Sequence, residues 1–263
     1  SRKINEAKVL QGEILLTSKN YQTAIDILEP LANKTTAAKE AYQKATYFRG
    51  LQFYNERAFP NALSMFMRSG NYVEDKEIHA LSVYWMAEAM YELRKYGEAV
   101  ATFEKFLGLP IANKTEVYNF ANYGLGYAAF EDEKYVKAAN YFERFLRGSD
   151  KDTKTVNDAI MRLADSYFVN KNYSEALTNY NKIINGRLTG DDYALFQRGM
   201  IQGLEKQDDA KIATMQSLLS KFPTSNYADD AGFETAYTYF NKGDNDKSKS
   251  DLIDLIAKYP RSS

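Results

Sequence analysis

The chain has no cysteine, a single histidine and a single tryptophan, and it has no long apolar run. Without cysteine it forms no disulfide, no thiolate metal site and no cysteine nucleophile. His79, the one histidine, cannot build a multi-histidine metal site, and we interpret it as a structural residue near a helix start. No apolar stretch approaches the ~20 residues that a membrane-spanning helix needs, so we expect no membrane insertion of this segment.

Excess positive charge is also lacking. Lysine and arginine number 34 against 35 aspartate and glutamate residues, which gives a net charge of −1. A nucleic-acid-binding surface neutralises phosphates with clustered basic residues, so we expect no nucleic-acid partner. The paired acids Asp191-Asp192, Asp208-Asp209 and Asp229-Asp230 are typical of helix starts, where carboxylates face the positive end of the helix dipole.

Nucleotide-binding loops are missing as well. Gly124-Leu125-Gly126 lies in a predicted helix and lacks the glycine spacing, preceding strand and lysine of a phosphate site. We therefore predict a protein that is not an enzyme, with no catalytic residue, no metal and no cofactor.

What the sequence does have is a repeat. A small residue recurs along the whole chain at intervals of 35 to 39 residues, at Gly12, Gly50, Ala87, Gly126, Ala164, Gly199 and Ala236. An alanine follows twelve residues later in the first five units, at Ala24, Ala62, Ala99, Ala138 and Ala176. These twelve positions are called the marker residues below. A large apolar side chain, such as Phe66 or Phe142, follows each of these alanines after four more residues. An internal period of this size predicts stacked units that bury their apolar faces against their neighbours.

The spacing within each unit predicts two helices joined by a short polar turn, and hence seven hairpins in all. Glycine inside a helix costs about 1 kcal/mol relative to alanine, so its recurrence at one phase requires a compensating close contact. We predict that Gly50 faces Ala62 and that Gly126 faces Ala138 where the two helices of a hairpin cross. The aromatic residue one turn later is expected to fill the space between one hairpin and the next.

The order of small residue, aromatic, short turn, aromatic, alanine, aromatic and Tyr-Pro or Phe-Pro resembles the tetratricopeptide repeat. It is clearest in residues 87–110 and 236–260, and the resemblance covers about residues 5–260. It implies an all-α, right-handed α-solenoid formed by a single array over residues 1–263. The predicted units are residues 5–42, 43–79, 80–118, 119–156, 157–191, 192–228 and 229–263. Residues 220–231 also resemble the longer units of bacterial cell-envelope assembly and coordination proteins.

The sixth unit departs from the pattern. Asp208, Lys211 and Met215 stand where the other units carry an aromatic, an alanine and an aromatic. A shifted frame that uses Ala210 and Ala213 is an alternative. In either frame we expect different packing in this unit and a local bend of the array at residues 200–220.

The resemblance implies that the first helix of each hairpin lines a concave groove. Ligand contacts in this family come from positions three and two residues before the small residue, and one and four residues after it. From these positions we select as groove contacts Tyr47, Tyr84, Trp85, Tyr123, Tyr127, Arg162, Phe196, Phe233 and Tyr237. Any one of the tyrosines is more often structural than ligand-binding, but as a set the aromatics favour recognition of an extended peptide or a partner helix.

The function predicted from these features is a scaffold that binds a protein or peptide partner. We expect a segment of a larger bacterial envelope-associated protein, periplasmic or at the outer membrane, with the cytoplasm as the alternative. The absence of an initiator methionine and the uncovered apolar residues Leu252, Leu255 and Ile256 favour such a segment. Two further alternatives are a regulatory or substrate-recognition segment of a larger enzyme, and a glycan or small-ligand groove.

Overall fold

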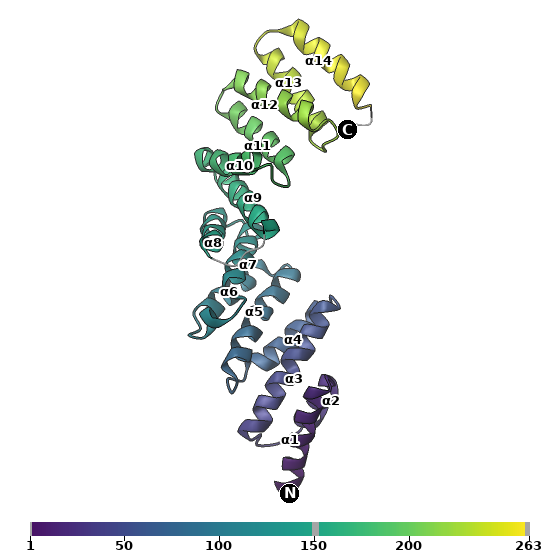
Figure 1. Ribbon diagram of the computed structural model, residues 1–263, viewed down its shortest axis with the longest axis vertical. Helices are drawn as coiled ribbons and strands as arrows, with labels where there is room; N and C mark the ends of the chain where they lie inside the picture. Colours follow the sequence, from purple (N-terminus) through teal and green to yellow (C-terminus); the bar gives the residue numbers. More distant parts are fainter. Residues whose placement is uncertain (1, 149–152, 261–263) are drawn as a thin grey trace. The chain divides into compact units, whose positions relative to one another are not determined.

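The computed structural model describes residues 2–148 and 153–260, in which fourteen α-helices and one short 3₁₀ helix form and no strand occurs (Figure 1). The α-helices are α1 (Arg2–Thr17), α2 (Tyr21–Leu28), α3 (Thr36–Asn55), α4 (Phe59–Gly70), α5 (Lys76–Glu92), α6 (Tyr96–Leu107), α7 (Tyr118–Glu131), α8 (Tyr135–Arg147), α9 (Thr153–Val169), α10 (Tyr173–Gly186), α11 (Asp191–Leu204), α12 (Asp208–Lys221), α13 (Ala228–Asn241) and α14 (Asn245–Lys258). The 3₁₀ helix η1 (Ala112–Lys114) lies between α6 and α7. The odd-numbered helices are the first helices of the hairpins, and the even-numbered ones are the second helices.

The chain divides into two compact units. Unit 1 comprises residues 1–148, with α1 to α8, and unit 2 comprises residues 149–263, with α9 to α14. Within each unit every helix packs against the next one along the chain, as expected for stacked hairpins. The predicted fold class, an all-α solenoid of helix hairpins, is confirmed. That the two units form a single array, and that it bends at residues 200–220, remain predictions.

The first helices of several hairpins begin earlier than the predicted repeat units. Helix α3 is 20 residues long and begins at Thr36, before the predicted boundary at residue 43. It begins there because the side chain of Thr35 caps its N-terminus. The hydroxyl of Thr35 accepts a hydrogen bond from the amide of Ala38 at 3.2 Å, which replaces a bond that the helix cannot supply there. The acidic pairs at residues 191–192, 208–209 and 229–230 lie in the first turns of α11, α12 and α13, which confirms their predicted place.

The turn inside each hairpin is closed by one residue in the left-handed region. These residues are Lys19, Arg57, Arg94, Glu133, Lys171 and Lys206, with φ from 58° to 62°, and Gly243, with φ of 82°. A left-handed residue lets a helix stop and the next one begin within a few residues. The same turn geometry therefore recurs in the seven hairpins of the described residues.

All twelve marker residues are buried. The contact that explains the glycines is different from the predicted one, however. A Cβ added to Gly50 would lie 2.6 Å from the ring of Phe66, and one added to Gly126 would lie 2.6 Å from the ring of Phe142. The same geometry places Gly12 on Leu28 and Gly199 on Met215. The predicted glycine–alanine pairs are therefore corrected: glycine makes room for the large side chain one turn after the alanine.

The large side chains that follow the marker alanines by four residues pack either within their own hairpin or against the next one. Phe142 meets the rings of Tyr123 and Tyr127, on the first helix of its own hairpin, at 6.2 and 5.5 Å between centroids. Phe103 reaches the next hairpin, where a Cβ on Gly124 of α7 would lie 2.6 Å from its ring. The predicted role as a filler between hairpins thus holds for Phe103, whereas Phe142 packs within its hairpin.

A buried polar contact ties the second hairpin to the third. The side-chain nitrogen Nε2 of Gln43 donates to the backbone carbonyl oxygens of Tyr72 and Asp75 at 3.0 and 2.9 Å. The side-chain oxygen Oε1 of Gln43 accepts from the backbone amide of Asp75 at 2.9 Å. Ser69 donates to the Gln43 carbonyl at 2.9 Å. Gln43 therefore satisfies the backbone of the loop before α5, which the repeat pattern did not predict.

The sixth hairpin packs differently from the others, as predicted. Lys211 stands at the alanine position and is 8% exposed, with Nζ 2.5 Å from Oε2 of Glu234 on α13. Gly203 on α11 makes room for the lysine stem, since a Cβ there would lie 3.0 Å from Cδ of Lys211. Met215 takes the aromatic position, so the unshifted frame describes the contact.

Replacing Lys211 by methionine is expected to lower the free energy of unfolding by about 2 kcal/mol, because Glu234 keeps a poorly hydrated charge without its partner. The double variant Lys211→Met, Glu234→Gln is expected to come back to within about 1 kcal/mol of the native protein. Denaturant unfolding of the two single variants and the double variant measures this coupling. Additive effects would contradict it.

Candidate functional site: the faces of the first helices

The nine predicted contact residues lie on the first helices, but they differ widely in exposure. In unit 1, Tyr47 and Tyr84 are buried, whereas Trp85, Tyr123 and Tyr127 are half-buried. In unit 2, Arg162 and Phe196 are half-buried, whereas Phe233 and Tyr237 are exposed. Which of them contact a ligand remains a prediction.

Tyr47 and Tyr84 belong to the core. Tyr47 packs with Ala62 and Phe66, and the ring of Tyr84 meets those of Phe103 and Phe106 at 5.7 and 5.6 Å. Burial raises the pKa of Tyr47 to about 12 and that of Tyr84 well above its ordinary value. Tyr47 and Tyr84 are only 6% and 7% exposed, so they pack in the core beneath the exposed side chains of the first helices. They offer little surface to a ligand.

The half-buried rings of unit 1 form a patch across three first helices. Tyr54 of α3 meets Trp85 of α5 edge to face at 4.9 Å, and Tyr91 of α5 meets Tyr127 of α7 at 6.3 Å. Between these ring pairs, on α5, lies Glu88. We call Tyr54, Trp85, Glu88, Tyr91 and Tyr127 the aromatic face of unit 1.

Glu88 is the chemically unusual member of this face. Burial raises the pKa of its carboxyl group to about 7, the hydrogen bond from the hydroxyl of Tyr84 opposes that rise, and the charge of Glu92 adds to it. A carboxyl group with this pKa changes its charge near neutral pH.

The raised pKa of Glu88 predicts a pH dependence of stability. The folded protein holds the proton more tightly than the unfolded chain, whose pKa is about 4.5, so the contribution of Glu88 to stability is lost as pH rises from about 4.5 to about 7. The loss is at most about 3 kcal/mol. Glu88→Gln is therefore expected to match the native protein at low pH and to be more stable above about pH 7. Urea unfolding across this range measures the difference, and a constant difference would contradict the assignment.

A pocket of about 620 Å³ lies on the first-helix side of the first hairpin. Its α1 wall contains Val9 and Glu13, which occupy the predicted contact phase, together with exposed Leu10. The opposite wall is the loop of residues 31–35 and the start of α3. This pocket is lined by both apolar and polar side chains, and it shares no residue with the aromatic face.

In unit 2, Arg162 is held by a buried acid. Its Nη1 donates to Oδ2 of Asp165 at 2.8 Å, while Oδ1 of Asp165 accepts from the hydroxyls of Tyr180 and Tyr193 at 2.8 and 3.0 Å. Burial raises the pKa of Asp165, against the effect of these donors. Arg162 also lines a pocket of about 400 Å³ together with Tyr193 and Tyr227. The arginine therefore has a structural partner as well as access to this pocket.

The most exposed aromatic residues of unit 2 lie on one side of α13. Phe233, Tyr237 and Phe240 are 50%, 48% and 58% exposed, and the rings of Phe233 and Tyr237 stack with 7° between their planes. We call these three residues the aromatic face of unit 2. Phe196 is not part of it, because its ring stacks on Tyr227 at 5.5 Å. Exposed aromatics gathered in this way are typical of interaction surfaces.

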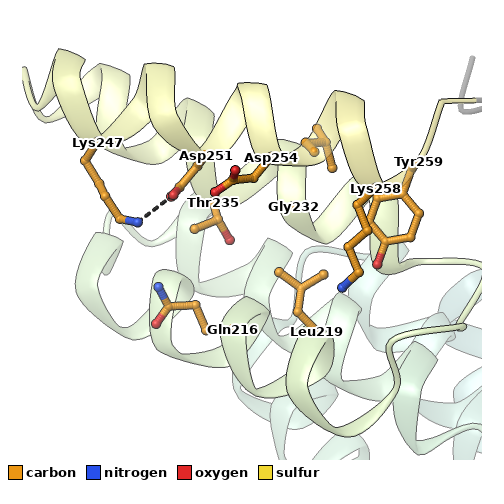
Figure 2. Close-up of a pocket in the computed structure, with 10 residues that line it drawn as sticks. Gln216, Leu219, Gly232, Thr235, Lys247, Asp251, Asp254, Lys258 and Tyr259 are labelled. Carbon is orange, nitrogen blue, oxygen red and sulfur yellow. Dashed lines mark hydrogen bonds and ion pairs between the residues drawn. The ribbon is translucent and has the colours of Figure 1, made fainter.

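A smaller pocket of about 220 Å³ opens among α12, α13 and α14. Figure 2 shows α14 side chains, including Asp254 and Lys258, above Gln216 and Leu219 of α12. Its charged residues include the ion pair of Lys247 and Asp251, with 2.5 Å between Nζ and Oδ1. The mixture of both signs of charge in a small space identifies no ligand.

Two classes of site are not found in the part of the chain that the structure describes. Residues 2–148 and 153–260 hold no group of three or more histidine, cysteine, aspartate or glutamate side chains placed to bind a metal ion. Within the same residues, none of the helices combines the length and apolar character needed to cross a bilayer.

Solved structures with this fold are numerous, although no curated protein matches the chain. The C-terminal part of a TPR repeat-containing protein from Cytophaga hutchinsonii is 14% identical, with a TM-score of 0.64, and the match covers 97% of this chain and 96% of that one. YrrB, described as a TPR protein with an unusual peptide-binding site, is 22% identical with a TM-score of 0.55, over 74% of this chain and 93% of that one. The apo form of the quorum sensor NprR from B. thuringiensis is 13% identical with a TM-score of 0.55, over 98% and 77%.

At such low sequence identity these structures show only the fold, so the family of the chain is assigned from family models. Two models, both described as tetratricopeptide repeat, match residues 84–153 and 123–192, and residues 193–225 and 230–262. Together these ranges span more than half of the sequence. The chain therefore belongs to the tetratricopeptide repeat family.

Proposed function

We propose that this chain is a non-catalytic scaffold that binds a peptide, or an extended segment of a partner protein, on the faces of its first helices. The observation that carries the proposal is the aromatic face of unit 2, where three large rings on one helix are about half exposed. Burying such rings against a partner removes apolar area from water at little entropic cost. The aromatic face of unit 1 offers the same chemistry on three helices.

The comparison with YrrB supports the choice of a peptide as partner, because that structure is described as having a peptide-binding site. The likeness of residues 220–231 to bacterial envelope assembly proteins supports an envelope-associated partner. Fractionation of cells that express the natural protein, followed by detection with an antibody against this chain, tests whether the protein is associated with the cell envelope.

The test of the scaffold is affinity capture from native lysate with three forms of the chain. The first is unchanged. The second carries Phe233→Ala, Tyr237→Ala and Phe240→Ala. The third is a matched control that removes three exposed apolar side chains from second helices, by Val136→Ala, Ile253→Ala and Ile256→Ala.

Recovery of the partner is expected to fall sharply with the α13 variant and to stay unchanged with the control. Circular dichroism of all three forms establishes that the substitutions leave the helices intact. Full recovery with the α13 variant, or equal losses with both variants, would remove the proposed binding surface.

A further inference from the structure

Glu88 has no cationic partner among the described residues, although it lies in a poorly hydrated place. Its hydrogen-bond donor is the neutral hydroxyl of Tyr84, and the charge that most affects its carboxyl group is that of Glu92. Neither side chain neutralises it. A carboxylate at such a position is stabilised if a cation arrives from outside the chain.

Aromatic rings lie near this carboxyl group on α3, the first helix of the preceding hairpin, and on its own helix α5. Tyr54 of α3 is near enough for the charge of Glu88 to raise its pKa, and its ring meets Trp85 at 4.9 Å. Trp85 in turn meets Tyr84 at 5.4 Å. Tryptophan and tyrosine attract cations to the faces of their rings, and the attraction strengthens as water is excluded.

The charges around this face are mainly negative. Glutamates raise the pKa values of two of its tyrosines: Glu88 and Glu92 act on Tyr54, and Glu92 and Glu131 act on Tyr91. Glu77 does the same to Tyr47 in the core nearby. A basic side chain among the described residues acts in the opposite sense: Arg57, in the turn after α3, lowers the pKa of Tyr54. An anionic partner would be repelled here, whereas a basic one would be attracted.

We propose that the partner places a lysine or arginine side chain on Glu88, against the rings of Tyr54 and Trp85. The inference rests on the proposed function, and it names the chemistry of the peptide that the aromatic face of unit 1 binds. The cation pairs with the carboxylate while its aliphatic stem packs on the rings. Neighbouring apolar side chains of the peptide lie on Tyr91 and Tyr127.

Binding of this kind is coupled to pH. The bound cation requires the ionised form of Glu88, so a partly protonated carboxyl group must release its proton when the peptide binds. The other titratable groups that face it are Tyr84 and Glu92 on α5 and Tyr54 on α3, and the tyrosines stay protonated below about pH 9. Affinity is therefore expected to rise as pH increases from about 6 to about 8.

The experiment selects binders from a random peptide library displayed on phage, with the full chain as the target. Enriched peptides are expected to share a lysine or arginine next to an apolar or aromatic residue. One such peptide is then synthesised with its basic residue intact or replaced by norleucine. Both forms are measured by fluorescence anisotropy against the native chain, Glu88→Gln and the control Glu98→Gln, which changes an exposed acid on α6.

Glu88→Gln is expected to weaken binding of the basic peptide by about tenfold or more, to leave the norleucine peptide unaffected, and to abolish the rise with pH. Glu98→Gln is expected to change none of these. Enriched peptides without a basic residue, or equal binding by the native chain and Glu88→Gln, would overturn this inference and leave the scaffold in place. A library that yields no binder would overturn both this inference and the proposed scaffold function.

Discussion

Phe142→Ala is expected to lower the free energy of unfolding of unit 1 by about 3–5 kcal/mol. The side chain is fully buried, and its ring contacts Tyr123, Tyr127 and the backbone of Gly126 on the facing helix. Alanine would leave a cavity that this rigid crossing cannot close. Urea unfolding followed by circular dichroism measures the loss.

A matched control for Phe142→Ala is Phe240→Ala, which removes an equal ring from a side chain that is 58% exposed. The control is expected to change stability by less than about 1 kcal/mol. Similar losses for the two variants would show that Phe142 does not have the buried role assigned to it.

Gly126→Leu is expected to have an effect of similar size from the opposite cause. A Cβ at this position would lie 2.6 Å from the ring of Phe142, a distance that forces α7 and α8 apart. Overpacking of this kind costs about 3 kcal/mol or more where the obstacle is a buried ring. Thermal and urea unfolding both measure it.

Gly97→Ala is the control for Gly126→Leu, since a Cβ at Gly97 would meet Asp132 at an ordinary distance of 3.5 Å. This glycine lies in α6, where alanine is the better helix former by about 1 kcal/mol, so the control is expected to stabilise the protein slightly. The double variant Gly126→Leu, Phe142→Ala is expected to recover part of the loss of each single change. A loss that is fully additive would contradict their direct contact.

The repeat pattern predicted the helices well because their positions depend on local spacing. Small residues at a fixed phase, polar turns and paired acids at helix starts each act over a few residues, and a single sequence contains that information. The nearest neighbours of Gly50 and Gly126 were predicted wrongly, because they depend on how two helices cross. Gly126 and Ala138 are both small residues at fixed positions of the repeat, which suggested that they face each other. The ring of Phe142, one turn after Ala138, is long enough to occupy the space next to Gly126.

The candidate site could be predicted as a set of positions but not as a surface. Tyr84 and Trp85 are adjacent in the sequence, and packing against Phe103 and Phe106 buries the first, while the second stays half-exposed. Glu88 occupies a contact position of the repeat, but its altered acidity comes from the burial of its carboxyl group in the folded chain. No pattern within one unit carries that information.

Trp85 provides the most direct test of the central claim in unit 1, that the faces of its first helices bind a basic peptide of the partner. It is the single tryptophan of the chain, so its fluorescence reports on the aromatic face of unit 1 alone. Titration with a basic peptide selected from the library is expected to shift the emission of Trp85 and to saturate at the concentration at which the anisotropy of the labelled peptide saturates. Saturated binding without any change in the emission of Trp85 would contradict the claim.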